Sequence, residues 1–331
     1  MMKRLIFAAT AVTAALSILA PGLAQSAYPE KPVRVIVTFP PGGSTDAVMR
    51  VIAPKLGERL GQQVIIDNRP GAGGNIGMAA VAQADPDGHV TGIGAAGALA
   101  ANVSLLESMP FDPIKDLAPI TLVAHIPFVL VAHPSVPAQT AQEFLAAARS
   151  RKVPFTLAHG GNGTAMHLSG ELLKQMAGID LTSVAYKGSG PAAIDAIGGQ
   201  VDLAIVDLPS ALQHIKSGKL RALAVTSARR LAMLPDVPTL DEAGVPGYES
   251  TGWFGFVAPA GTPEDVIQRL QNEMTAVLRD PEVIQRGEAM GVELAPTSAR
   301  DFGDFIKSET EKWAKVITTA GMRPQPGGKT N

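Results

Sequence analysis

The chain has 331 residues, enough for two domains of ordinary size, and 46% of them are hydrophobic, which excludes a disordered protein. The formal net charge is −2 and aromatic residues make up 5%, so the composition argues against nucleic acid as a partner. There is no cysteine, which excludes disulfides, thiolate metal sites and a lipid anchor on cysteine.

Residues 1–27 have the pattern of a secretory signal peptide, in which a positively charged start precedes an apolar run and small residues follow. The apolar run, from Leu5 to Ala20, is shorter than the ~20 residues that a membrane span needs, which disfavours the alternative of an uncleaved anchor. We therefore expect an exported protein. Cleavage after Ala24 and cleavage after Ala27 both remain open.

The first predicted strand, residues 33–39, leads into the segment Pro40–Asp46, which opens a helix that is predicted to stop at Gly61. The turn contains two glycines, two hydroxyl side chains and an acid. It exposes backbone N–H groups at a helix N-terminus, where the peptide dipoles favour an anion. The alternative is an ordinary turn capped by Ser44 or Thr45. Asp46 is a candidate general base, although an acid in a first helical turn more often serves the helix dipole.

Strands and helices are predicted to alternate along the rest of the chain. The predicted strands cover 63–67, 89–93, 120–132, 155–158, 181–186, 203–206, 220–226 and 253–257, and the predicted helices cover 78–84, 138–150, 165–177, 191–198, 209–217 and most of 263–319. This alternation predicts an α/β fold with a parallel sheet flanked by helices. The glycine-rich turn at 68–77 does not follow the GxGxxG spacing, so we reject a dinucleotide-binding fold.

A second glycine-rich turn, His159–Thr164, joins the strand at 155–158 to the helix at 165–177. It repeats the organisation of the first turn and predicts a second anion-binding helix N-terminus in a second α/β unit. Two β-rich apolar runs, near 122–132 and 250–258, bracket this unit. We therefore expect two domains joined by two hinge strands, with a ligand in the cleft at the carboxyl ends of strands.

The sequence lacks the common catalytic and metal-binding motifs. It contains no GxSxG, HExxH or Walker A segment, and its six histidines include no pair four residues apart. For His167 we favour packing over ligand contact, and for His159, at a strand end in the expected cleft, the two are balanced. We therefore predict no catalytic residue, no metal and no cofactor.

Eight segments together resemble the periplasmic solute receptors of tripartite tricarboxylate transporters, often called the Bug family. In chain order they are YPEKPVRVIVTFPPGGSTD, VIIDNRPGAGGNIG, MPFDPIKDLAPI, AYKGSGPAAIDAIGGQVDLA, SGKLRALAVTSARR, LPDVPTLDEAGVPGYE, GFVAPAGTPEDVIQRL and EKWAKVITTAGM. The resemblance covers Tyr28 to about Met322.

The resemblance implies a type II-like, two-domain periplasmic binding protein, each domain a parallel-type sheet flanked by helices. We expect residues 28–125 plus 253–331 in domain 1 and residues 126–252 in domain 2. The implied function is that of a monomeric, non-enzymatic receptor that captures a small carboxylate and hands it to a permease of two integral membrane subunits. A ligand-sensing subunit of a signalling system is an alternative, and an enzyme on the same fold is another, which the missing motifs disfavour.

The resemblance also implies that backbone amides and ordered waters at the two glycine turns hold the ligand carboxylate. The implied contacts are Phe39, Pro40, Gly42, Gly43, Ser44 and Thr45 in the first turn, and Gly160, Gly161, Asn162, Gly163 and Thr164 in the second. Further candidates are Asn75, Ala96, His159, Tyr186, Lys187 and Asp207. For Asn75 packing and ligand contact are equally favoured, and Lys187 is expected to be solvated.

Two departures from the family pattern bear on the ligand. Relatives commonly read FDNLPS where this chain reads IVDLPS, so that Val206 takes the usual acid position and Asp207 the amide position. Relatives also tend to carry hydroxyls where this chain has Gly94–Ala98. A site without the acid loses a partner for an amine, and a site without the hydroxyls suits a polyhydroxy acid less well. We therefore expect a non-amino carboxylate with an apolar or compact body, of unassigned identity and affinity.

Overall fold

The computed structural model describes residues 28–319 and 321–322, so the predicted signal peptide lies outside the described residues. The strands are β1 (Val33–Val37), β2 (Val64–Asn68), β3 (Val90–Ala95), β4 (Leu117–Ala132), β5 (Phe155–His159), β6 (Leu181–Ala185), β7 (Leu203–Asp207), β8 (Arg221–Val225), β9 (Thr251–Pro259) and β10 (Glu293–Leu294). The helices are α2 (Ser44–Leu60), η1 (Ala72–Gly74), α3 (Asn75–Ala82), η2 (Gly97–Ala101), α4 (Asn102–Leu105), α5 (Ala141–Ser150), α6 (Ala165–Ala177), α7 (Ser189–Ile197), α8 (Leu208–Lys216), α9 (Glu264–Leu278), α10 (Pro281–Met290) and α11 (Ala299–Thr319).

The strands form one mixed sheet in the order β2-β1-β3-β9-β4-β7-β5-β6, with β8 and β10 also paired to β4. Strands β1, β2 and β3 are parallel to one another, and so are β5, β6 and β7. Strands β4 and β9 run antiparallel to their neighbours. The predicted parallel units are therefore present, and the two crossing strands make the complete sheet mixed.

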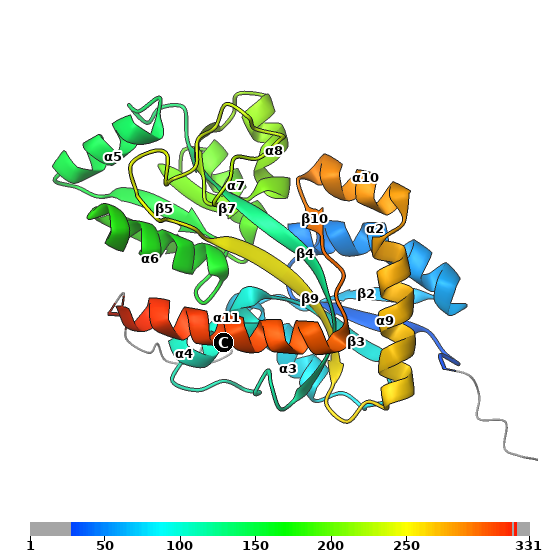
Figure 1. The fold of residues 1–331 in the computed structure, drawn as a ribbon. Coiled ribbons are helices and arrows are strands. Elements are labelled where there is room, and N and C mark those ends of the chain that lie inside the picture. Colours follow the sequence, from blue (N-terminus) through cyan, green and yellow to red (C-terminus); the bar gives the residue numbers. More distant parts are fainter. Residues whose placement is uncertain (1–27, 320, 323–331) are drawn as a thin grey trace, which may run out of the picture.

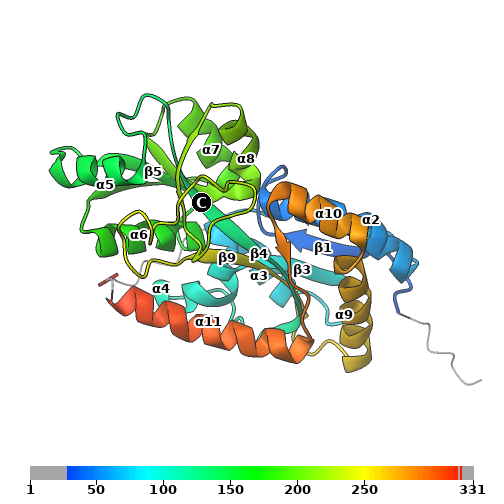
Figure 2. The ribbon, with the colours of Figure 1, turned by 45° about the horizontal axis from the view of Figure 1, so that its top comes forward.

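Two lobes lie on either side of the crossing strands (Figures 1 and 2). The first lobe contains β1–β3 with α2, α3, α4, α9, α10 and α11, and the second lobe contains β5–β8 with α5–α8. Strand β4 changes partner between two consecutive residues, because Pro127 pairs with Thr251 of β9 and Phe128 pairs with Asp207 of β7. This exchange supports the predicted domain boundaries near residues 126 and 252, which stay a prediction.

Local signals explain several element boundaries. Helix α2 ends at Gly61, which takes the left-handed conformation with φ 72° as the sequence predicts. Helix α5 begins after Thr140, whose hydroxyl accepts the N–H of Glu143. The helical region after residue 263 divides into three helices, since Asp280 caps α10 and Gly291 ends it. The turn and helix at 97–105 were not predicted.

Helix α11 packs along the crossing strands and covers the first lobe (Figure 1). The buried carboxylate of Glu309 accepts the indole N–H of Trp253 on β9 and that of Trp313 on the same helix. These bonds hold the longest helix against a strand that leads into the second lobe. Within the described part of the chain, no helix combines the length and apolarity that crossing a bilayer requires.

Candidate functional site

A cavity of about 290 Å³, here called the interlobe cavity, lies between the lobes at the carboxyl ends of β1, β3 and β7. This volume is at the lower end of the range for small-molecule sites. The lining residues are Phe39–Thr45, Ala95 and Ala96 from the first lobe, Ile126, Phe128 and Gly252–Phe254 from the crossing strands, and Thr164–Met166, Gly188–Pro191, Ile194 and Asp207 from the second lobe.

The first glycine turn is held by a buried carboxylate. Asp46 accepts the N–H of Gly42 at 2.9 Å, the Nε of Arg50 at 2.7 Å and the Nδ2 of Asn68 at 3.0 Å. Burial acts to raise the pKa of Asp46, but these hydrogen bonds outweigh it and hold the pKa below its ordinary value. Asp46 is therefore committed to the turn rather than free to act as a general base.

The N-cap of α2 is Gly43, which has no side chain with which to cap the helix. The interpretation that Ser44 or Thr45 caps this helix is therefore wrong. The hydroxyl of Ser44 instead crosses between the lobes and donates to Oδ2 of Asp207 at 2.5 Å. The N–H groups of the first turn of a helix have no acceptor within it, so those of α2 remain directed toward its N-terminal end.

Three helix N-termini meet at Asp207, which is 2% exposed. Besides the bond from Ser44 at the start of α2, its Oδ1 accepts the N–H of Ser210 in α8 at 3.1 Å. Its own N–H donates to the hydroxyl of Ser189 at the start of α7 at 2.9 Å. Burial raises the pKa of Asp207, against the lowering effect of these hydrogen bonds.

One inference about this strand needs correction. The chain has not lost an acid from the cavity, because Asp207 lines it, whereas Val206 is fully buried. Consecutive side chains on a strand point to opposite faces, so a shift of one position decides which residue meets the cavity. The sequence named Asp207 as a candidate contact, and what needs correction is the inference that the site has lost its acid.

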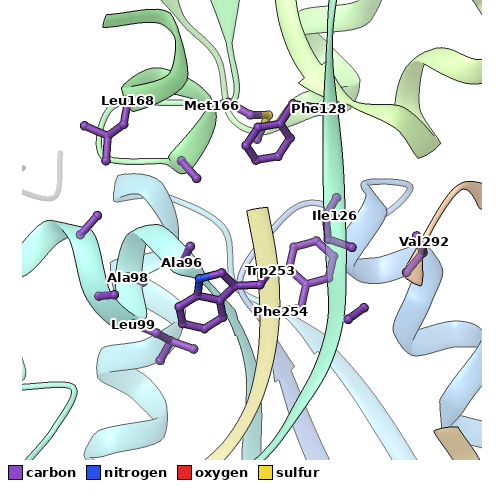
Figure 3. Packing of buried hydrophobic residues seen from close by; sticks show 14 of the residues in the cluster. Ala96, Ala98, Leu99, Ile126, Phe128, Met166, Leu168, Trp253, Phe254 and Val292 are labelled. Carbon is purple, nitrogen blue, oxygen red and sulfur yellow. The ribbon is translucent and has the colours of Figure 1, made fainter. Parts of the chain in front are cut away.

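The rest of the cavity wall is apolar. Figure 3 shows Phe128 and Met166 on one side, with Ile126, Trp253 and Phe254 on the other. The indole N–H of Trp253 is turned away to Glu309, at 2.9 Å. Ala95 and Ala96 add methyl groups to this wall, where the sequence pattern suggested that hydroxyls are missing.

Residues 160–162 of the second glycine turn line a different space, while its last residue, Thr164, lines the interlobe cavity. A second cavity, of about 320 Å³, is lined by Phe39, Gly71–Asn75, Leu106, Gly160–Asn162 and Ala185–Lys187. The N–H groups of the turn are largely engaged, because Gly161 donates to Nδ1 of His159, Gly163 to Nδ1 of His167, and Thr164 to the carbonyl of Gly161. The N-terminus of α6, through Thr164–Met166, and that of α7, through Ser189–Pro191, both line the interlobe cavity together with that of α2.

The predicted site residues fall into three groups. Those that line the interlobe cavity are Phe39, Pro40, Gly42, Gly43, Ser44, Thr45, Ala96, Thr164 and Asp207. Those that line the second cavity are Phe39, Asn75, Gly160, Gly161, Asn162, Tyr186 and Lys187. His159 and Gly163 are not among the lining residues of either cavity, and His159 is 1% exposed. Ligand contact at each of these positions stays a prediction.

Two further observations concern the candidates whose roles were left open. Asn75 is buried and its Oδ1 accepts the side-chain amide of Asn102 at 3.0 Å, so it packs as well as lining the second cavity. Lys187 is exposed. Among the described residues, no group of three or more histidine, aspartate or glutamate side chains is arranged to hold a metal ion.

Sequence reasoning missed two parts of the cavity wall. Ser189, Gly190 and Pro191 carried a usable signal, because a glycine and a serine before a proline mark a helix start after a strand. The apolar residues of the crossing strands carried none. A strand residue that faces an apolar cavity is of the same type as one that faces the core, so the sequence does not tell the two apart.

A family model described as tripartite tricarboxylate transporter family receptor matches residues 48–322. Protein BugT of Bordetella pertussis is 36% identical over 319 residues, which cover 96% of each chain. A UPF0065 protein in the tcbD-tcbE intergenic region of Pseudomonas sp. strain P51 is 39% identical over 292 residues, which cover 88% of this chain and 87% of the relative.

Solved structures include close relatives over the same length. The periplasmic binding protein BugD is 36% identical with a TM-score of 0.86, over 90% of this chain and all of that one. Rpa4515 of R. palustris, solved with adipate, is 36% identical with a TM-score of 0.87, at the same coverage. MatC of Rhodopseudomonas palustris, solved with malate, is 32% identical with a TM-score of 0.83, over 88% of this chain and all of that one.

Proposed function

The chain belongs to the tripartite tricarboxylate transporter receptor family, and from this premise we propose that it captures a small carboxylate in the interlobe cavity and delivers it to a membrane permease of two integral subunits. Family membership makes the protein a receptor rather than an enzyme. The carboxylate class is supported by the two relatives that were solved with adipate and with malate.

The observation that carries the proposal is the position of the N-termini of α2 and α7, which line the same cavity from opposite lobes. Backbone N–H groups at helix N-termini bind carboxylates without an arginine or lysine. The glycines at 42, 43, 188 and 190 leave the backbone accessible from the cavity. An anionic group bound there touches both lobes at once, which couples binding to closure.

The described structure has the lobes in contact. Gly97 of the first lobe lies so close to Gly163 of the second that a Cβ on Gly97 would clash with the carbonyl of Gly163. A Cβ on Gly73 would come within 2.5 Å of the carbonyl oxygen of Asn162. The ligand enters when the lobes separate, and it shifts the population toward the closed form, because only that form offers both N-termini. The permease recognises the closed, loaded receptor.

The receptor acts as a monomer in the periplasm after its signal peptide is removed. It needs no metal or cofactor, because backbone amides and hydroxyls supply the contacts to the carboxylate.

The test is a ligand screen on the mature protein after endogenous ligand has been removed by unfolding and refolding. The panel contains mono-, di- and tricarboxylates, aromatic acids and amino acids, and the readout is the Tm. A ligand at roughly 100 times its Kd stabilises the native state by about 2.7 kcal/mol, so binding is readily seen. We expect carboxylates to raise the Tm and sugars and free amines to leave it unchanged.

Gly43→Val is the blocking variant, because its side chain crowds the carbonyl of Pro40, which lies 3.3 Å from the position of a Cβ. Gly198→Val, at the far end of α7, is the matched control, since its nearest neighbour would lie 3.6 Å away. A Tm shift lost in the first and kept in the second supports the site. If no carboxylate raises the Tm, or if both variants respond like the wild type, the proposal is wrong.

Delivery is tested separately in the source cells. Deletion of the receptor gene is expected to abolish uptake of a radiolabelled ligand from the screen, and a plasmid copy of the gene is expected to restore it. Undiminished uptake in the deletion strain would contradict delivery while leaving binding intact.

A further inference from the structure

Among the described residues, Asp207 is the one ionisable side chain that lines the interlobe cavity. It is 2% exposed, and its carboxyl group accepts hydrogen bonds from two neutral donors, the Ser44 hydroxyl at 2.5 Å and the Ser210 N–H at 3.1 Å. Buried carboxylates are as a rule paired with a cation. The cavity that is proposed to bind an anion therefore already contains an acid whose donors are neutral.

The charged groups of the neighbouring elements do not bring a cation to the cavity wall. In the first two turns of the helices that start around the cavity, in the turn before α7, and beside the cavity on β4 and β5, the titratable side chains are Asp46, Arg50, His125, His159, His167, Glu171, Lys187, Asp195 and His214. None of these side chains lines the interlobe cavity. Arg50 donates to Asp46 at 2.7 Å, and Lys187 is exposed and lines the second cavity. The described wall of the interlobe cavity thus offers an anion backbone N–H groups and hydroxyls, but no formal positive charge.

A bound carboxylate makes the negative charge on Asp207 less favourable. The cavity is small, at about 290 Å³, so a ligand carboxylate lies near Asp207 wherever in the cavity it binds. The helix N-termini around the cavity lower the energy of both carboxylates, but they do not remove the repulsion between them. When two carboxylates share a buried site, the pKa of one rises and it holds a proton. Burial already raises the pKa of Asp207, which makes this carboxyl the one that takes up the proton.

We propose that Asp207 is a proton-binding residue of the ligand site, so that the receptor binds a carboxylate together with one proton. The proton comes from the solvent on binding, stays on the carboxyl group of Asp207 and returns to the solvent on release. This inference rests on the proposed receptor function and deepens it. The affinity is highest where Asp207 is protonated with and without ligand. It falls by up to tenfold per pH unit as the pH rises from the pKa of Asp207 in the free protein to the higher pKa in the complex.

Isothermal titration calorimetry on the mature protein tests the proposal with adipate, malate and benzoate as probes. Titrations at pH 6.5, 7.5 and 8.5, each in two buffers that differ in ionisation enthalpy, give the affinity and the number of protons taken up. Free carboxylates are ionised above about pH 6, so in this range the proton count reports the protein. For a probe that binds, we expect uptake of up to one proton and an affinity that falls by at least about fivefold between pH 6.5 and 8.5.

Four variants test the reason. Asp207→Asn and Asp207→Ser remove the titrating carboxyl and keep a side chain that caps α8, so both should bind without proton uptake, with an affinity that varies by less than about twofold over the same pH range. Asp180→Asn is the matched control, because it removes an exposed carboxylate of the second lobe that does not line the cavity, and it should behave as the wild type. Ser44→Ala removes a donor to Asp207, which raises the pKa of Asp207 and should move the fall in affinity to higher pH.

The outcomes separate the inference from the proposed function. If the wild type binds a carboxylate without proton uptake and with an affinity that does not change with pH, or if the variants at position 207 keep the pH dependence of the wild type, the inference is overturned while the receptor function stands. If neither variant at position 207 folds, an unshifted pH dependence in Ser44→Ala overturns it. If no probe binds at any pH and no carboxylate raises the Tm in the ligand screen, the inference and the proposed function both fall.

Discussion

At the scale of single residues, His159 and His167 form a buried pair behind the second glycine turn, with ring centroids 4.6 Å apart. The Nδ1 atoms of the two rings accept the N–H groups of Gly161 and Gly163, so the pair shapes the turn that contacts the first lobe. The Nε2 of His159 has no hydrogen-bond partner among the described residues. Burial lowers the pKa of both histidines, and that of His159 to about 4.

This pair predicts a loss of stability in acid. The ordinary pKa of 6.5 exceeds the folded value of about 4 for His159, so the unfolded chain takes up a proton first as the pH falls. The contribution of neutral His159 to the free energy of unfolding is fully present above pH 6.5. As the pH falls to about 4, this contribution is lost, and the loss is on the order of 3 kcal/mol. His159→Asn keeps an acceptor near Nδ1 and removes the titration, so its unfolding free energy should fall less between pH 7.5 and 4.5.

The measurement is urea unfolding of both proteins at the two pH values. At pH 7.5 the difference between the proteins reports packing alone, because His159 is neutral in both states. An equal fall in stability for the variant and the wild type would show that His159 does not carry the effect.

Glu309 predicts a second effect of a single side chain on stability. Its Oε2 accepts the indole N–H of Trp253 at 2.9 Å and that of Trp313 at 3.1 Å. Glu309→Ala leaves two buried donors without an acceptor, so urea unfolding should report a loss on the order of 2–5 kcal/mol. Glu309→Gln is the control, because its amide oxygen still accepts, and it should lose less than half as much. Equal losses in the two variants would mean that packing, not hydrogen bonding, is what Glu309 provides.

At the scale of elements, the contact between η2 and the second glycine turn governs closure. Gly97 begins η2 and lies against the backbone of Gly163 at the start of α6. Backbone meets backbone here, so there is no flexible side chain that moves aside for an added Cβ. The two elements belong to different lobes, and the contact exists in the closed form.

Gly97→Ala is therefore expected to weaken ligand binding without unfolding the protein. The clash with the carbonyl of Gly163 raises the free energy of the closed form, and an open form avoids it. Calorimetry should show a loss of affinity of about tenfold or more, while the Tm of the ligand-free variant stays close to that of the wild type. Gly198→Ala, whose nearest neighbour would lie 3.6 Å from the Cβ, is the control and should bind normally. Unchanged affinity in Gly97→Ala would contradict this role.

At the scale of the whole molecule, strands β4 and β9 connect the lobes, and further hydrogen bonds link the lobes elsewhere. Gln175 of α6 donates to the carbonyl of Thr319 at the end of α11, at 2.9 Å. Together with the bond from Ser44 to Asp207, it links the lobes away from the crossing strands. One buried hydrophobic cluster also runs from the first lobe through the crossing strands into the second lobe. We expect the lobes to open by bending about β4 and β9, because a ligand has to reach the cavity between them.

Small-angle X-ray scattering tests this expectation. The radius of gyration of the ligand-free protein should be larger than that calculated from the closed structure, and a saturating ligand should bring it to the calculated value. Gly97→Ala should keep the larger radius at a ligand concentration that closes the wild type. Identical scattering of the wild type with and without ligand would contradict ligand-driven closure.

The sequence by itself determined the local part of the fold. Helix α6 covers the predicted range 165–177, and Gly61 ends α2, because apolar spacing and a left-handed glycine are local signals. The alternation of strands and helices predicted the parallel strands of both lobes. The composition of the first glycine turn and the family pattern predicted that this turn lines a ligand site, and it does line the interlobe cavity. The eight segments identified the family.

The tertiary structure decided what depends on distant segments. It brought Ser44, Ser189 and Asp207 together, it turned Asp207 rather than Val206 to the cavity, and it added the start of α7 to the cavity wall. It also made the sheet mixed through β4 and β9. Local patterns report which face of an element is apolar, but not which element covers that face. That depends on strand pairing and on contacts between the lobes, such as the one between Ser44 and Asp207, which lie 163 positions apart.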